Sequence, residues 1–188
     1  ESVNALDDTL EIEAIDIESR NGLVARSIQE LARDRRTICF CTTVIHARNL
    51  AKELNQLGLP TGIVWGSMKR DDRRAVLAKF KAGELSVITN VGVLTEGFDD
   101  PGVSCIAMAR PTKSSALYAQ CVGRGSRLAP NKDDCIILDF VDASALSLVT
   151  LPSLFGFPVQ FDLEGADISE VDEKVQHWMQ LDLGFEME

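Results

Sequence analysis

Two arginines in the second half of the chain give the clearest chemical signal in this sequence. Gln120, Gly123, Arg124 and Arg127 form the pattern Q-x-x-G-R-x-x-R. A separation of three residues predicts that both arginines lie on one face of a helix, and Gln120 lies four residues before Arg124 on the same face. Because guanidinium groups are planar and always charged, a fixed pair of them suits the charge on a transferring phosphoryl group. An ordinary surface salt bridge is the competing interpretation.

The residues around Arg124 favour the phosphate interpretation. Gly123 precedes it and Gly125 follows it. Glycine inside a helix costs roughly 0.5–1 kcal/mol relative to alanine. Two glycines at this position therefore predict a close approach of the backbone to another part of the molecule, which an isolated surface salt bridge would not need.

The arginine pattern is one of four motifs that stand in the order found in superfamily 2 helicases. Residues 120–127 resemble motif VI of that family, and residues 87–99, which read V-I-T-N-V-G-V-L-T-E-G-F-D, resemble motif V. Two further stretches resemble motifs IV and IVa: residues 38–47, and Gly66-Ser67-Met68 with Arg73 and Phe80. The wording T-E-G-F-D-D-P is closer to the XPB-like, UvrB-like and restriction-motor branches than to DEAD-box proteins. Four ordered motifs are specific where each alone is weak.

Two motifs of the same family are absent from this sequence. It holds no G-x-x-x-x-G-K-[ST] phosphate loop and no D-E-x-H or D-E-A-D box, and it begins at Glu1 without a methionine. In the family those motifs lie on a first RecA-like domain. The resemblance therefore implies the second motor domain of a longer ATP-dependent helicase or translocase. It also implies ATP and Mg²⁺ bound mainly by the N-terminal RecA-like domain, so that this fragment alone should be inactive.

The resemblance assigns roles at the nucleotide. Arg124 and Arg127 match the arginine fingers that reach ATP across the cleft, and Gln120 matches a residue that orients the helix or assists the phosphate contact. Gly97 and Asp99 match the G-x-D of motif V, where the aspartate meets the ribose. Gly123 joins them as an expected ATP-binding residue, and a turn before Asp100-Pro101 is the competing interpretation of Asp99.

The resemblance also implies contacts to the nucleic-acid backbone, through Thr43, Arg73, Thr89 and Thr95. Hydroxyl groups and helix N-termini bind phosphate without reading sequence. Which of Thr89 and Thr95 makes the contact stays open. The motif wording favours DNA, and RNA remains an alternative. His46 is interpreted as a helix-start residue that satisfies its neighbours.

The charge is distributed unevenly. The chain carries −10 overall, with −7 in residues 1–19, +7 in residues 20–138 and −10 in residues 139–188. The motif-bearing segment is therefore basic and could bind phosphates, although most of its side chains should form an ordinary solvated surface. A non-catalytic scaffold that binds a partner through the acidic ends is the alternative function. The presence of Gln120, Arg124, Arg127 and Asp99 together favours the motor.

The cysteines and hydropathy limit the class of protein. Five cysteines occur without any C-x-x-C pair, and only two histidines are present. These counts predict reduced thiols, an intracellular protein and no metal site. No apolar run reaches the roughly 18 residues of a membrane span.

Helical and strand patterns alternate along the chain. They predict an α/β fold with a mainly parallel sheet flanked by helices, and the resemblance implies a RecA-like three-layer domain over residues 19–145. Residues 1–18 are expected to be an acidic linker or edge segment, and residues 146–188 an acidic extension with a turn-rich loop at 151–158 and a docking helix at 169–181. The predicted helices are 19–34, 45–57, 71–81 and 114–122, and the predicted strands 37–42, 61–64, 85–89, 104–109 and 135–140. Thr42, Thr89, Asp99 and Arg110 are expected at or just after carboxyl ends of strands, where such sheets bind ligands.

Overall fold

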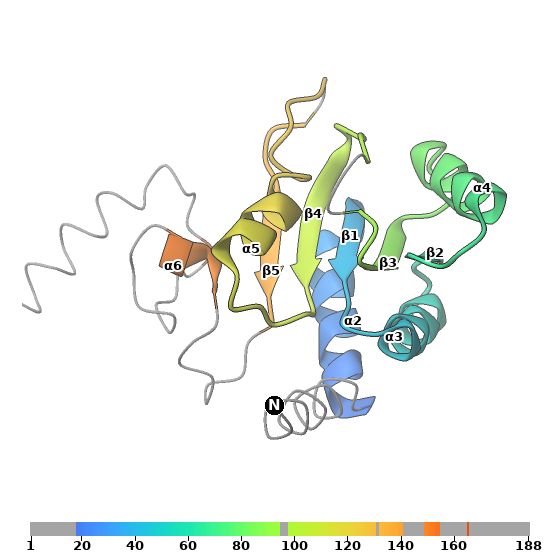
Figure 1. Ribbon diagram of the computed structural model, residues 1–188, viewed down its shortest axis with the longest axis horizontal. Coiled ribbons are helices and arrows are strands. Elements are labelled where there is room, and N and C mark those ends of the chain that lie inside the picture. The colour runs from blue at the N-terminus through green and yellow to red at the C-terminus, as the bar shows by residue number, and fades with distance from the viewer. Residues whose placement is uncertain (1–17, 95–97, 131, 141–148, 155–164, 166–188) are drawn as a thin grey trace, which may run out of the picture.

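A parallel sheet of five strands forms the centre of the molecule (Figure 1). The computed structural model describes residues 18–94, 98–130, 132–140, 149–154 and 165. The strands lie in the order β2-β3-β1-β4-β5, and every pairing is parallel. Their bounds are β1 (Arg36–Phe40), β2 (Thr61–Trp65), β3 (Val87–Val91), β4 (Val103–Met108) and β5 (Ile136–Asp139). The predicted α/β fold with a parallel sheet is confirmed.

Helices cover both faces of this sheet. The helices are α2 (Glu18–Ala32), α3 (Val44–Gln56), α4 (Arg70–Lys81), α5 (Ser115–Val122) and α6 (Leu151–Leu154). Buried residues of α2 and α3 share one core cluster, and buried or partly buried residues of α4, α5 and α6 share the other. Because each helix buries one stripe against a sheet face, the result is the three-layer architecture expected of a RecA-like domain.

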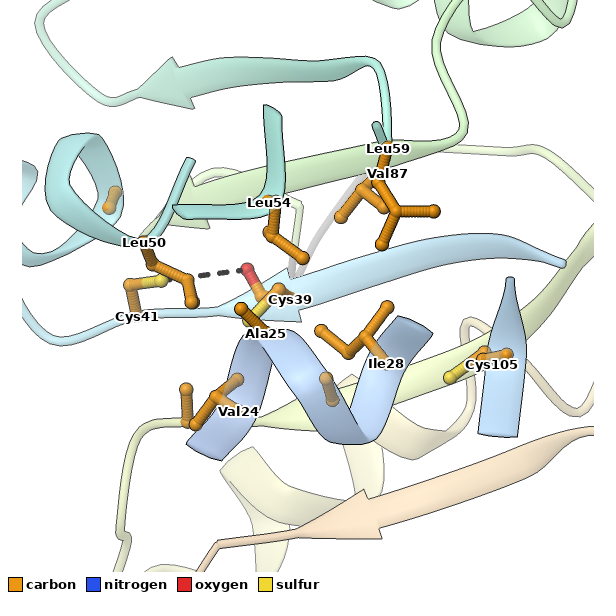
Figure 2. Packing of buried hydrophobic residues seen from close by; sticks show 14 residues of the cluster. Val24, Ala25, Ile28, Cys39, Cys41, Leu50, Leu54, Leu59, Val87 and Cys105 are labelled. Atoms are coloured by element: carbon orange, nitrogen blue, oxygen red, sulfur yellow. Dashed lines mark hydrogen bonds between the residues drawn. The ribbon is translucent and has the colours of Figure 1, made fainter. Parts of the chain in front are cut away.

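The two faces of the central strands differ in side-chain size. In β1, Ile38 and Phe40 point into the cluster with α4 and α5, whereas Cys39 points to the opposite face with α2 and α3. Figure 2 shows Cys39 and Cys105 facing Ala25 and Ile28 of α2. Small side chains on this face allow α2 to lie close against the sheet, which accounts for cysteine in an apolar strand.

Local signals set the ends of the helices. The Thr43 hydroxyl accepts a hydrogen bond from the His46 N–H at 3.0 Å and caps α3, and the Ser114 hydroxyl caps α5 by accepting from Leu117 N–H at 3.2 Å. Gly58 and Gly83 follow α3 and α4 with φ of 77° and 79°, a conformation that favours glycine. All four helices predicted within the described part of the chain are present, with no end shifted by more than two residues.

After β3 the chain adds its remaining strands on the opposite side of β1. The strands β1, β2 and β3 occupy one side, and the chain then crosses β1 to place β4 on its other flank. Because the strands are parallel, all of them begin at one edge, called here the amino edge, and end at the other, the carboxyl edge. Strands of this length hold the two edges roughly 15–20 Å apart.

The end of the chain differs in part from expectation. Residues 151–158 were expected to be a turn-rich loop, but Leu151–Leu154 forms the short helix α6, which the Thr150 carbonyl and the Ser153 hydroxyl help to start. Residues 1–17 of the predicted segment 1–18, and the predicted helix 169–181, lie outside the described residues, so the proposed boundaries of the terminal segments remain predictions.

Candidate functional site

The two arginines of the Q-x-x-G-R-x-x-R pattern do not lie on a helix, contrary to the sequence expectation. Helix α5 ends at Val122, Gly123 is its C-terminal cap, and Arg124 and Arg127 lie in the turns that follow. The physical reason is the pair of glycines, which disfavour a continued helix. The Gly125 N–H donates to the Val122 carbonyl at 2.8 Å and closes the first turn of this segment, called here the arginine loop (residues 123–127).

Motif V holds both arginines. Arg127 forms an ion pair with Asp99, and Arg124 Nη1 donates to the Phe98 carbonyl at 2.9 Å. Phe98 is buried against Phe80 of α4, with ring centroids 6.5 Å apart. The structure therefore brings together the predicted residues Arg124, Arg127 and Asp99, although their shared helical face is absent.

This cluster lies at the amino edge, so the expected position of Asp99 at a strand's carboxyl end is wrong. Asp99 and Asp100 come directly before β4, and Asp100 pairs with Arg36, the first residue of β1, at 3.2 Å. Helix α5 starts after the carboxyl end of β4 and runs back along the sheet, which delivers the arginine loop to the same edge. Between the end of β3 at Val91 and Asp99, motif V therefore passes from the carboxyl edge back to the amino edge.

The predicted close backbone approach is confirmed at Gly125. A Cβ atom placed on this buried residue would lie 2.3 Å from Cys135 Sγ and 2.8 Å from Ile106 Cγ1. The space around Gly123 is also narrow, because a Cβ atom there would lie 3.0 Å from the Ala119 carbonyl oxygen. The arginine loop is therefore pressed against β4 and the segment that leads into β5.

Lys132 contacts the arginine loop and motif V together, and sequence reasoning missed it. Its ammonium donates to the carbonyls of Arg127 at 2.7 Å, Pro101 at 3.3 Å and Gly125. Burial lowers the pKa of this lysine. In the sequence Lys132 precedes Asp133 and resembles a surface charge, since only the fold gathers three carbonyls around it.

The remaining residues expected at the nucleotide occupy different environments. Gln120 is exposed on α5, and Gly123 caps that helix. Gly97 lies outside the described residues. The side chain of Asp99 is 71% exposed and that of Arg127 is 37% exposed, so both can meet a ligand from solvent.

The carboxyl edge holds the C-terminal part of motif IV and the first residues of motif IVa, from Gly66 to Arg73. Thr43 caps α3, and buried His46 places Nδ1 3.0 Å from the Thr42 hydroxyl. This agrees with the interpretation of His46 as a helix-start residue that satisfies its neighbours. Arg73, in the first turn of α4, donates through Nη2 to the Met68 carbonyl at 3.3 Å.

Thr89 differs from the other residues predicted to contact nucleic acid. It is fully buried in β3, and its hydroxyl donates to the Ala47 carbonyl of α3 at 3.0 Å. Because that hydroxyl ties β3 to α3 and is turned away from the surface, the geometry disfavours a direct contact by Thr89. Thr95, the alternative, lies outside the described residues.

The described part of the chain offers no cluster of three or more histidine, cysteine or acidic side chains that could hold a metal ion. Its five cysteines form no disulfide, and burial raises the pKa of Cys105 and Cys121 to about 12. These thiols are therefore weak nucleophiles at neutral pH. No described helix has the length and apolar character to cross a membrane.

Comparison with known proteins agrees with the four motifs. IRC3 of Saccharomyces cerevisiae is 40% identical over 129 residues, which cover 67% of this chain and 19% of that protein. The irc3 protein of Schizosaccharomyces pombe is 36% identical over 121 residues, covering 64% of this chain and 20% of its own length. The chain thus spans about a fifth of the length of these relatives.

A solved structure shares the fold. Dbp5 of S. cerevisiae, bound to RNA and ADP BeF3, aligns with a TM-score of 0.56 and 23% identity, over 66% of this chain and 32% of that one. The family described as the helicase conserved C-terminal domain matches residues 21–129, which include the arginine loop, motif V and both edges of the sheet. The chain belongs to the helicase conserved C-terminal domain family.

Proposed function

We propose that this chain is the second motor domain of an ATP-dependent helicase or translocase of superfamily 2. In this proposal its amino edge faces ATP and Mg²⁺ bound by an N-terminal RecA-like domain of the same longer protein. The observation that carries the proposal is the pairing of Arg127 with Asp99 and of Arg124 with the Phe98 carbonyl. Both IRC3 relatives are described by name as ATP-dependent helicases, which supports the same conclusion.

Arg127 is the stronger candidate for an arginine finger. Its ion pair with Asp99 is exposed to solvent, and such pairs contribute about 0–1 kcal/mol. An arginine finger contributes a rate factor of about 10³–10⁵, or about 4–7 kcal/mol. Exchanging Asp99 for a γ-phosphate therefore costs little beside the expected gain.

The other residues of the amino edge have supporting roles in this proposal. Arg124 is half-buried and fixed to the Phe98 carbonyl, from which it would add positive charge beside the phosphates. Asp99, released from Arg127, would accept hydrogen bonds from the ribose hydroxyls. Gln120 would assist the phosphate contact, and Gly97 and Gly123 would let the backbone approach the nucleotide.

At the carboxyl edge we propose contacts to the backbone of a nucleic-acid strand. The Thr43 hydroxyl accepts from His46 N–H and keeps its own hydrogen to donate to a phosphate. Arg73 lies at the start of α4, where its charge adds to the N-terminal end of the helix dipole. The motif wording supports DNA over RNA, and the unpaired cysteine pattern supports an intracellular location. Parallel titrations with DNA and RNA strands of one sequence would decide between the two acids.

The test of this function is Arg127→Ala in the longer protein that contains both motor domains. Turnover of ATP in the presence of single-stranded DNA should fall by about 10³-fold or more, while the Kd for DNA stays within about twofold. Arg74→Ala is the matched control, because Arg74 is an exposed arginine paired only loosely with Asp71, at 3.8 Å. Equal turnover in wild type and the Arg127 variant would refute the finger assignment.

A further inference from the structure

Arg48 and Trp65 form a cation–π pair at the carboxyl edge. The Arg48 guanidinium carbon lies 5.5 Å from the centre of the Trp65 ring. Arg48 is exposed on α3, one turn after the Thr43 cap, and half-buried Trp65 is the last residue of β2. No hydrogen bond or ion pair to the Arg48 guanidinium is present within the part of the chain that the structure describes.

The surroundings of this pair consist of three chain segments that meet at one edge. Trp65 is paired in register with Val91 at the end of β3, and exposed Gly66 and Ser67 follow it directly. The first turn of α3, capped by Thr43, lies one turn before Arg48. The Arg48–Trp65 pair thus lies among the residues already proposed to contact a nucleic-acid backbone.

The ring determines what the guanidinium can do. A guanidinium held over an aromatic ring by a cation–π interaction uses none of its N–H donors for that contact, and the ring restricts the many conformations that a long arginine side chain otherwise samples. An oriented guanidinium is suited to bind two phosphate oxygens at once. Exposed Lys52, one turn further along α3, and Lys69 before α4 add positive charge nearby.

We propose that Arg48, held by Trp65, is a binding residue for the phosphodiester backbone of a single DNA strand at the carboxyl edge. This inference rests on the proposed nucleic-acid binding and extends it to a residue pair that none of the four motifs assigned to the strand. Trp65 acts as the positioning residue, and Arg48 makes the contact. Since the contact is to phosphate, it should be independent of base sequence.

The test is a salt titration of binding by this chain to a fluorescein-labelled oligo(dT), followed by anisotropy between about 50 and 200 mM NaCl. Arg48→Ala should weaken binding about three- to tenfold at the lowest salt and reduce the slope of log K against log[salt] by about 0.7, the value for one phosphate on a single strand. Arg48→Lys should keep the slope and lose part of the affinity, because lysine retains the charge without the planar fork.

Variants of the ring test its positioning role. Trp65→Leu should weaken binding without reducing the salt slope, since the charge at Arg48 remains, and Trp65→Phe should restore much of the affinity by replacing the ring face. Arg33→Ala is the matched control, because Arg33 is an exposed arginine that follows α2 at the opposite, amino edge. It should change neither affinity nor slope.

The outcomes separate this inference from the proposed function. A wild-type chain that binds neither DNA nor RNA strands would remove the nucleic-acid part of the proposed function, and this inference with it. A wild-type chain that binds, with Arg48→Ala matching its affinity and slope, would overturn the Arg48 contact alone. Equal binding by the Trp65→Leu and Trp65→Phe variants would overturn the positioning role of the ring.

Discussion

The two edges of the sheet prepare their cations in different ways. At the amino edge, Arg127 pairs with Asp99 and Lys132 binds three carbonyls, so the charges are already held by groups of the same chain. At the carboxyl edge, Arg48 lies on a ring and no described carboxylate neutralises it. The contacts at the amino edge fix the geometry of its cations, but their partners within the chain compete with the ligand. Arg48 at the carboxyl edge is available to any phosphate. The amino edge therefore suits chemistry at one atom, and the carboxyl edge suits a nucleic-acid backbone that moves past it.

Motif V joins these two environments. Thr89 and Asn90 end the strand side of the motif in the buried core, and Leu94 is buried among the residues that pack α4 and α5 on the sheet. Phe98, buried in the same cluster, leads to Asp99 at the amino edge. Motif V therefore begins at the amino edge with Val87, reaches the carboxyl edge at Val91 and is back at the amino edge at Asp99.

The first prediction removes the Lys132 ammonium, which binds three carbonyls at the amino edge. Lys132→Met, in the longer protein with both motor domains, should lower kcat for ATP by up to about 10²-fold, because a shift of about 1 Å in a catalytic group can cost that much. The Kd for DNA should not change, since Lys132 lies at the amino edge and the proposed DNA contacts lie at the carboxyl edge. Steady-state turnover and anisotropy on the same preparations measure both quantities.

Lys113→Met is the control for that experiment, because Lys113 is an exposed lysine after β4 at the carboxyl edge. Lys132→Arg should retain part of the turnover, since it keeps charge and donors but not the compact ammonium. If the Lys132→Met enzyme turned over ATP at the wild-type rate, the lysine would be a surface charge without influence on the arginine loop.

The second prediction compares glycines at the two edges. Gly125→Ala should lower the free energy of unfolding by about 1–3 kcal/mol, because the added methyl group overlaps Cys135 and Ile106. Gly66→Ala, at the carboxyl edge, should change it by less than about 0.5 kcal/mol, since a Cβ at Gly66 meets no atom within 4 Å. Urea unfolding followed by circular dichroism gives both values, and equal losses would contradict the packing difference between the edges.

The fold could be predicted from the sequence because its signals are local. Apolar strand patterns, capping residues and glycines at helix ends depend on neighbours in the chain, and all helices predicted within the described range are present. The close approach at Gly125 followed from the cost of glycine in a helix. The predicted helix 114–122 ends where α5 ends, at Val122, so this boundary already conflicted with the expectation that both arginines share a helical face.

The errors concern direction and partners, which local patterns do not encode. Asp99 follows β3 in the sequence, so it was expected at a carboxyl end, but the chain returns to the amino edge before β4 begins. Thr89 resembles an exposed hydroxyl at a strand end, yet its partner Ala47 is 42 residues away. Lys132 and Arg48 depend on similarly distant contacts, which only the tertiary structure reveals.

The third prediction tests the other predicted cation of the carboxyl edge. Arg73→Ala should weaken binding to single strands of any sequence about three- to tenfold and reduce the salt slope by about 0.7, because one phosphate contact is lost. At saturating DNA, kcat for ATP should stay near wild type, since the arginine loop lies at the other edge. Arg74→Ala, which changes the exposed neighbour, is the matched control. Unchanged affinity and slope would make Arg73 an ordinary surface arginine.

The smallest expected effect concerns a buried carboxyl group at the carboxyl edge. Asp139, at the end of β5, accepts hydrogen bonds from the Tyr118 hydroxyl of α5 at 2.5 Å and from Leu151 N–H of α6 at 3.0 Å. Burial raises the pKa of Asp139, and of Tyr118 as well. This carboxyl therefore fastens α5, the helix that leads to the arginine loop, to the end of the sheet.

The sign of its pH dependence follows from that raised pKa. The folded state holds the Asp139 proton more tightly than the unfolded chain, so this group's contribution to stability is complete below the unfolded pKa and falls as pH rises through the folded value. Asp139→Asn cannot titrate. The free energy of unfolding of the wild type, measured relative to that variant by urea unfolding from about pH 4 to pH 7, should therefore decline with rising pH. A difference that is flat over this range would mean that the pKa of Asp139 is the same in both states, and a difference that rises would mean that its charged form is stabilised by the fold.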